Sequence, residues 1–104
     1  MFRDLFHDNS ISIKIDTENK TLYFSALLLA TRQPVPREVF TYVEKRKGLT
    51  FKPYATAFRM KDLRHVELIQ EVPYTPTIRR EITSFWHLVQ KCRVMFTDLA
   101  KESV

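Results

Sequence analysis

The stretch from residue 66 to residue 85, VELIQEVPYTPTIRREITSF, passes from one hydrophobic period to another and decides the fold. It starts as an apolar run typical of a strand, and Pro73 ends that run because proline cannot donate to a sheet. Pro76 suits the first position of a helix, and Thr75 before it is a suitable N-cap. The sequence therefore predicts a strand up to Pro73 and a helix from Pro76.

The residues after this joint have the clearest helical pattern in the chain. Seven apolar residues recur at alternating steps of four and three and fall on one face of a helix. Burial of each large side chain contributes about 1.5 to 3 kcal/mol, so this stripe has to be covered. We expect a long C-terminal helix packed on the chain's own sheet, with a partner helix as the alternative cover. The stripe consists of Ile78, Ile82, Phe85, Val89, Cys92, Phe96 and Leu99.

The residues near the start of the chain predict a β-hairpin. The segment ISIKID, residues 11–16, alternates apolar and polar side chains, as in a strand with one face buried. The polar segment TENK, residues 17–20, predicts the turn. The segment TLYFSALLLA, residues 21–30, is apolar on both faces, which is typical of a strand covered on both sides or central in a sheet.

A short helix and a further strand are predicted between this hairpin and the opening stretch. The segment RQPVPREVFTYVEKRKG begins with prolines that suit a helix start and ends with Gly48, which suits a left-handed cap. The segment LTFKPYATAFRM, residues 49–60, has extended character, and Pro53 favours a place at a sheet edge. The predicted fold is α+β, a mostly antiparallel sheet in the order β-β-α-β-β-α, preceded by a short helical piece in residues 1–9.

The composition predicts a single domain over residues 1–104. A content of 44% hydrophobic and 12% aromatic residues is sufficient for a core, and 104 residues fit one domain. No apolar run approaches the roughly 18 residues of a membrane span, and the start MFRDLFHDN does not resemble a signal peptide. Cys92 is the one cysteine, so no intramolecular disulfide forms, which fits a reducing compartment. We therefore expect a cytoplasmic protein.

The sequence predicts no catalytic site, no cofactor and no metal centre. The single glycine, Gly48, excludes glycine-rich nucleotide-binding loops and the GxSxG nucleophile motif. His7, His65 and His87 do not stand at metal-ligand spacing from another histidine, a cysteine or a carboxylate. Cys92 falls within the apolar stripe, where a thiol behaves as a small hydrophobe. We therefore expect a protein that is not an enzyme.

The formal net charge of +5 makes nucleic acid, anionic lipid or an acidic protein a candidate partner. Aromatic and basic residues are interleaved in one segment, as in a stacking platform for single-stranded nucleic acid. Acidic residues are scattered among the basic ones along the chain, and no groove-reading motif is present. A nucleic-acid-binding domain is therefore the second hypothesis. The platform residues would be Phe51, Lys52, Tyr54, Phe58 and Arg59.

Three segments together resemble a known family. ISIKIDTENKTLYFSALL supplies paired early strands, and PVPREVFTYVEKRKGLTF supplies a middle helix with a strand after it. In HVELIQEVP, followed by EITSFWHLVQKCRVMFTDLA, Leu68 and Pro73 form a Leu-x-x-x-x-Pro ending ahead of the last helix. Over roughly residues 10 to 100, this order is similar to that of the class I type III secretion chaperones, the family of the Tir chaperone.

The resemblance implies a non-enzymatic homodimer that binds an extended segment of a secreted effector in the bacterial cytosol and keeps it competent for export. The effector would add a strand at the sheet edge, and the copies would meet at the middle helix or the strand after it. About half of the dimer residues should also belong to the intramolecular core. A small adaptor domain of pleckstrin-like topology is a further alternative. The expected effector-binding residues are Phe51, Tyr54, Phe58 and Met60, and the expected dimer residues are Val39, Phe40, Tyr42, Val43 and Leu49.

Overall fold

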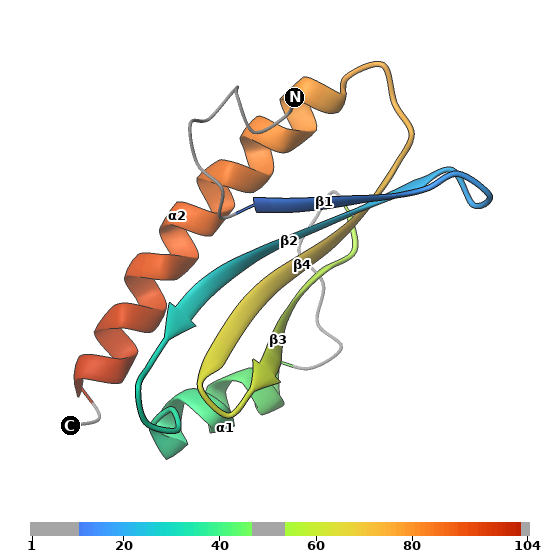
Figure 1. The fold of residues 1–104 in the computed structure, drawn as a ribbon. Coiled ribbons are helices and arrows are strands. Elements are labelled where there is room, and N and C mark those ends of the chain that lie inside the picture. Colours follow the sequence, from blue (N-terminus) through green and yellow to red (C-terminus); the bar gives the residue numbers. More distant parts are fainter. Residues whose placement is uncertain (1–10, 47–53, 103–104) are drawn as a thin grey trace.

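The computed structural model describes residues 11–46 and 54–102, which form one sheet and two helices (Figure 1). The class and the order of the elements confirm the predicted α+β fold, β-β-α-β-β-α. The short helical piece predicted in residues 1–9 lies outside the described residues. The elements are β1 (Ile11–Asp16), β2 (Thr21–Ala30), α1 (Arg37–Lys45), β3 (Thr56–Asp62), β4 (His65–Pro73) and α2 (Ile78–Glu102).

The four strands lie in the order β1-β2-β4-β3, and every neighbouring pair is antiparallel. The two central strands are therefore β2 and β4, while β1 and β3 lie at opposite ends of the sheet. β2 is apolar on both faces, as expected of a central strand. The register shifts between Leu27 and Leu29 in the β2–β4 pair and between Met60 and Asp62 in the β3–β4 pair.

Two aspartates shape the turns of the two hairpins. Between β1 and β2, Asp16 Oδ1 accepts the backbone N–H groups of Glu18 and Asn19, each at 3.1 Å. Between β3 and β4, Asp62 Oδ1 accepts the backbone N–H of Arg64 at 2.8 Å. Aspartate suits these positions because its short side chain reaches backbone groups two or three residues further on.

The joint between β4 and α2 differs from its prediction by two residues. The helix begins at Ile78 instead of Pro76. Thr75 Oγ1 accepts the backbone N–H of Thr77 at 3.2 Å, and Thr77 O accepts the N–H of Glu81 at 3.1 Å. The Thr75 hydroxyl therefore holds a turn ahead of the helix, and the first helical hydrogen bond starts at Thr77.

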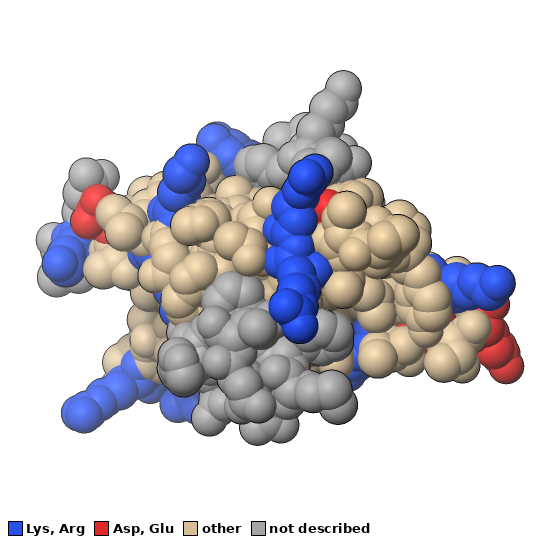
Figure 2. All heavy atoms as spheres, turned by 90° about the horizontal axis from the view of Figure 1, so that it is seen from above, with Lys and Arg blue, Asp and Glu red and all other residues tan. Residues whose placement is uncertain are grey.

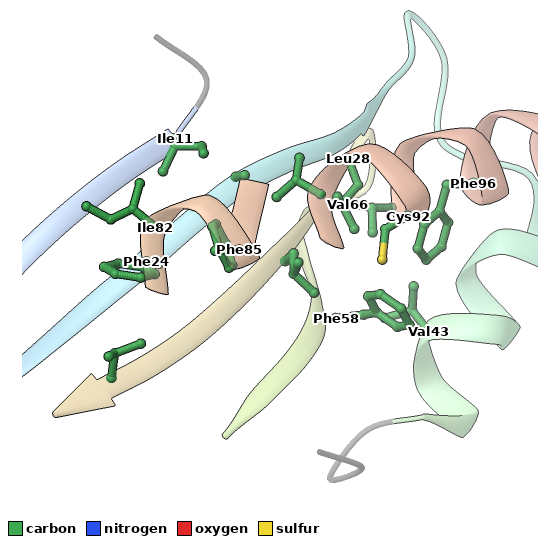
Figure 3. Packing of buried hydrophobic residues seen from close by; sticks show 14 of the residues in the cluster. Ile11, Phe24, Leu28, Val43, Phe58, Val66, Ile82, Phe85, Cys92 and Phe96 are labelled. Atoms are coloured by element: carbon green, nitrogen blue, oxygen red, sulfur yellow. The ribbon is translucent and has the colours of Figure 1, made fainter. Parts of the chain in front are cut away.

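The apolar stripe of α2 faces the sheet and builds the core (Figure 3). Phe85 lies against Phe24 of β2, with ring centroids 5.4 Å apart. Phe96 meets Phe58 of β3 edge-to-face at 5.0 Å and Tyr42 of α1 at 5.5 Å, so α1 packs against the same core. The buried members of the stripe are Ile82, Phe85, Val89, Cys92 and Phe96, and Ile78 and Leu99 at its ends are partly buried.

Candidate functional site

One face of the sheet, called the open face below, carries neither α1 nor α2, since both helices pack against the core on the other face. Its side chains alternate with the core residues along each strand, and Ser25 and Ala57, the neighbours of Ile69 on the two adjacent strands, are small. They leave a shallow hollow of about 460 Å³ on the sheet, which Tyr23 borders with a side chain 37% exposed. The side chains around this hollow belong to Lys14, Tyr23, Ser25, Ala55, Ala57, Arg59, Ile69 and Glu71.

An ion pair between β3 and β4 lies beside the hollow. Arg59 Nε donates to Glu67 Oε1 at 2.6 Å, and the same carboxylate oxygen accepts a second bond from Arg59 Nη2. Glu67 is buried, whereas the Arg59 side chain is more than half exposed. A buried carboxylate is costly unless it is paired, so Glu67 holds the arginine on the edge strand in one orientation.

The outer side of β3 is a sheet edge, because no other strand in the described part of the chain pairs with it. The Ala55 carbonyl accepts the Glu71 N–H at 2.9 Å, which shows that Ala55 directs its backbone groups toward β4. Backbone groups of successive residues in a strand point to opposite sides, so Thr56 and Met60 direct theirs away from β4. Together with Phe58, which lies between them on the same side, these residues mark where an added strand would bond.

The predicted effector-binding residues gather at β3 but do not form one exposed patch. Phe58 is buried in the core and only 4% exposed. Tyr54 and Met60 are partly buried against the core, near the two ends of β3. Phe51 lies outside the described residues. The face that carries Phe58 and Met60 is therefore the face that the helices cover, and a ligand could reach it only at the rim.

The predicted dimer residues divide between the core and the surface of α1. Val39 and Val43 are buried within the single chain, as half of the set was expected to be. Tyr42 is partly buried, with its hydroxyl 3.1 Å from Met95 Sδ. Phe40 is 42% exposed. Leu49 lies outside the described residues. Among the four described residues of the set, Phe40 is the one with an exposed side chain.

A second hollow lies where β1 and β2 meet the start of α2, and sequence reasoning missed it. It has a volume of about 520 Å³, and its lining is mostly apolar. Ile15 of β1 borders it and is 58% exposed. The signal in the sequence was Tyr74 between Pro73 and Pro76 in the joint ahead of α2, and the bond from the Tyr74 N–H to the Lys20 carbonyl brings that joint to the end of the β1–β2 hairpin. The lining residues are Ile15, Leu22, Tyr74, Thr75, Pro76 and Ile78.

The described residues offer little catalytic or metal-binding chemistry. Among them, no three or more His, Cys, Asp and Glu side chains come close enough together to hold a metal ion. His65 Nδ1 lies 2.7 Å from Asp62 Oδ1 at the β3–β4 turn, outside any hollow described above. Cys92 is buried in the core, and burial raises the pKa of its thiol, which disfavours the nucleophilic thiolate.

The predicted nucleic-acid platform is not assembled by the described residues. Phe58 is turned into the core, and Phe51 and Lys52 lie outside the described ranges. In the face shown in Figure 2, Lys and Arg side chains stand in separate groups along the molecule instead of one continuous patch. Neither α1 nor α2, the two helices of the described part, is long and apolar enough to cross a membrane.

No family model matches this sequence, and neither a curated protein nor a solved structure resembles it closely enough to count as a match. The candidate functional surfaces are therefore those described above. These are the outer edges of β1 and β3, the hollow on the open face, and the apolar hollow beside Ile15.

Proposed function

We propose that this chain is a non-enzymatic chaperone, active as a homodimer in the bacterial cytosol, that binds an extended segment of a secreted effector and keeps it competent for type III secretion. The observation that carries the proposal is the outer edge of β3, with the open-face hollow on one side of the strand and Tyr54 and Met60 on the other. The resemblance to the class I chaperones supplies the type of client.

The backbone of β3 supports binding by strand addition. Thr56 and Met60 direct their N–H and C=O groups to the outside, and an extended client segment can pair with such groups. Backbone pairing does not depend on the side chains of the client. A chaperone for an unfolded segment needs this property, because the segment has no folded surface to recognise.

Side chains next to the edge support a preference for apolar clients. On the helix side, Met60 and Tyr54 are only partly buried, so an apolar client side chain can bury the rest of their surface. On the open face, Ala57 is small and leaves room over the hollow, while Arg59 is fixed by Glu67 at its border. Alternate side chains of one added strand would reach these two sides in turn.

A photo-crosslinking experiment in the native host tests this proposal. A benzoylphenylalanine at Lys61, which is exposed on β3, should form adducts with the N-terminal regions of secreted proteins. The same probe at Lys91, exposed on α2, is the matched control and should not. If the probes at Lys61 and Lys91 crosslink the same proteins with the same yield, the result would contradict the proposal.

A pair of substitutions separates backbone pairing from side-chain contact. Met60→Pro removes an outward N–H without breaking a bond to β4, and edge strands tolerate proline. We expect at least about a 10-fold loss of the Lys61 adducts, equivalent to about 1.4 kcal/mol of binding. Met60→Leu keeps the N–H and should retain them. Circular dichroism of both variants verifies that the fold is intact.

A further inference from the structure

We propose that β1 is the surface through which two copies of this chain join their sheets, antiparallel and with Ile13 of one copy opposite the partner's Ile13. The interface would make one continuous sheet across the two-fold axis. This inference goes beyond client binding and does not depend on it. It assigns the copy contact to a strand instead of α1, where Val39 and Val43 are buried in the protomer's own core.

The backbone directions in the sheet define what β1 offers. The Lys20 carbonyl accepts the Tyr74 N–H at 3.0 Å, so the peptide group after Lys20 turns its oxygen toward β4 and the N–H of Thr21 toward β1. On the other side of β4, the Glu71 N–H bonds the Ala55 carbonyl of β3. Glu71 therefore faces away from β2, as the same alternation requires. Continued alternation makes Thr21, Tyr23 and Ser25 the β2 residues that bond β1.

The partners of those β2 residues in the β1 register are Asp16, Lys14 and Ser12. Their N–H and C=O groups are therefore turned inward. The alternate residues, Ile11, Ile13 and Ile15, direct theirs to the outside of the sheet, where the described chain supplies no strand. With Ile13 opposite its own copy, Ile11 faces the partner's Ile15, and all three outward residues are paired.

The side chains of β1 favour the same register. Ile15 is 58% exposed, whereas Ile11 is buried. In the proposed pairing the partner's Ile11 lies across from Ile15, so part of the exposed apolar surface of Ile15 is removed from water. The apolar hollow lined by Leu22, Tyr74 and Ile78 adjoins Ile15 and continues this contact on the helix side.

The two sheet edges differ in the features that prevent edge pairing. Natural sheets protect edges with bulges, prolines and charged side chains. The β1–β2 register runs from Ile11 to Asp16 without a shift, and the strand contains no proline. β3 has a register shift after Met60, whereas charged side chains occur on both strands. β1 is thus the less protected edge for pairing with an identical strand.

Charge also favours a second copy at β1. The strand carries one cation, Lys14, and one anion, Asp16, so two copies meet there without net repulsion although the chain is +5 overall. On α1, by contrast, one surface carries three cations, Arg37, Lys45 and Arg46, against one anion, Glu38. A two-fold contact over that surface would bring like charges together.

Charge and strand length decide among the symmetric registers. A register centred on Lys14 would oppose two lysines, which is destabilising. A register centred on Ile15 would place Ile13 opposite Thr17, and Thr17 has already left the strand for the turn. The register centred on Ile13 faces Lys14 with the partner's Ser12 and keeps the pairs of all three outward-directed residues, Ile11, Ile13 and Ile15, within β1.

A cysteine scan tests the interface and its register. In a Cys92→Ala background, single cysteines replace Ser12, Ile13, Lys14 and Ile15 in turn, and Phe40 on α1 serves as the control position. Directly opposed residues in a hydrogen-bonded pair have Cα atoms about 5.5 Å apart, within the disulfide range. Mild oxidation should give the highest yield of covalent dimer for Ile13→Cys. A maximum at Ile15 or Phe40, or no dimer at any position, would overturn the proposal.

Proline substitution on the two edges separates this interface from client binding. Ile13→Pro removes an outward N–H and leaves the bonds to β2, so light scattering at about 100 µM protein should show a monomer that still crosslinks clients through Lys61. Met60→Pro should show the reverse, a dimer without client. If Ile13→Pro remains dimeric while circular dichroism and the client adducts are unchanged, the proposed interface is wrong and the proposed function stands.

Discussion

Thr56 and Gln70 form a polar contact inside the core that fixes the start of β3. Gln70 Nε2 donates to Thr56 Oγ1 at 2.8 Å, and that hydroxyl donates to the Tyr54 carbonyl, also at 2.8 Å. Both side chains are buried, and they stand opposite each other in the β3–β4 register. Because an unpaired buried amide would be costly, this contact opposes slippage of β3 along β4. The proposed client edge therefore has a fixed position relative to the open face.

Asp62 gives a prediction about pH. The pKa of its carboxyl lies below the ordinary value of 3.8, first because it accepts the Arg64 backbone N–H and next because it bonds His65. A carboxyl with a lowered pKa in the folded state stabilises the fold above pH 3.8, and this contribution is lost as the pH falls through the folded-state pKa. The wild type should therefore exceed Asp62→Asn in stability at neutral pH.

Urea unfolding at several pH values measures this contribution. Asp62→Asn keeps an acceptor oxygen for the Arg64 N–H and removes the titrating group. The difference in unfolding free energy between the two proteins should shrink as the pH drops below 3.8. A difference that stays constant or grows toward low pH would show that the ionised Asp62 does not stabilise this turn.

At the scale of elements, α2 holds the molecule together because every other packed element contributes to the core beneath it. We predict that Phe96→Ala lowers the free energy of unfolding by about 3 to 5 kcal/mol, since the ring is fully buried against Phe58 and Tyr42. Val94→Ala lies on the opposite face of the same helix, where Val94 is 62% exposed, and should change stability by less than about 0.5 kcal/mol. Equal losses in urea denaturation would contradict the observed packing.

The elements could be predicted from the sequence because their patterns are local. The alternation in β1 and the four-and-three stripe of α2 depend only on nearby residues, and the structure places both as expected. The start of α2 was predicted two residues too early. Pro76 suits a first helical position, but the hydroxyl of Thr75 bonds the Thr77 N–H and continues the turn.

The arrangement of the edges could not be read from local patterns. Alternation showed that Phe58 and Met60 share a face, but not that the helices cover this face. It also could not show that β4 lies between β2 and β3, since that order depends on pairings such as Ala26 with Leu68, far apart in sequence. The outward backbone of Ile13, and with it the proposed copy interface, follows only once this order is known.

At the scale of the whole molecule, the charge distribution gives a prediction about nucleic-acid binding. The chain has 17 basic and 12 acidic residues, and Figure 2 shows the basic groups spread apart on the face it presents. Affinity for nucleic acid grows with the number of phosphates that are neutralised together. For single strands, each neutralised phosphate lowers the logarithm of the association constant by about 0.7 per log unit of salt. Separate groups engage few phosphates at once.

We therefore predict weak binding to a fluorescein-labelled single-stranded 20-mer, with a dissociation constant above about 10 µM at physiological salt, measured by fluorescence anisotropy. Lys14→Gln on the sheet and Lys45→Gln on α1 should lower the residual affinity by similar small factors, because a diffuse field depends on total charge and not on position. Binding tighter than 1 µM at physiological salt, abolished by one of the two substitutions alone, would locate a built site and reverse this conclusion. Because the two lysines lie on different elements, the comparison would also identify which surface carries that site.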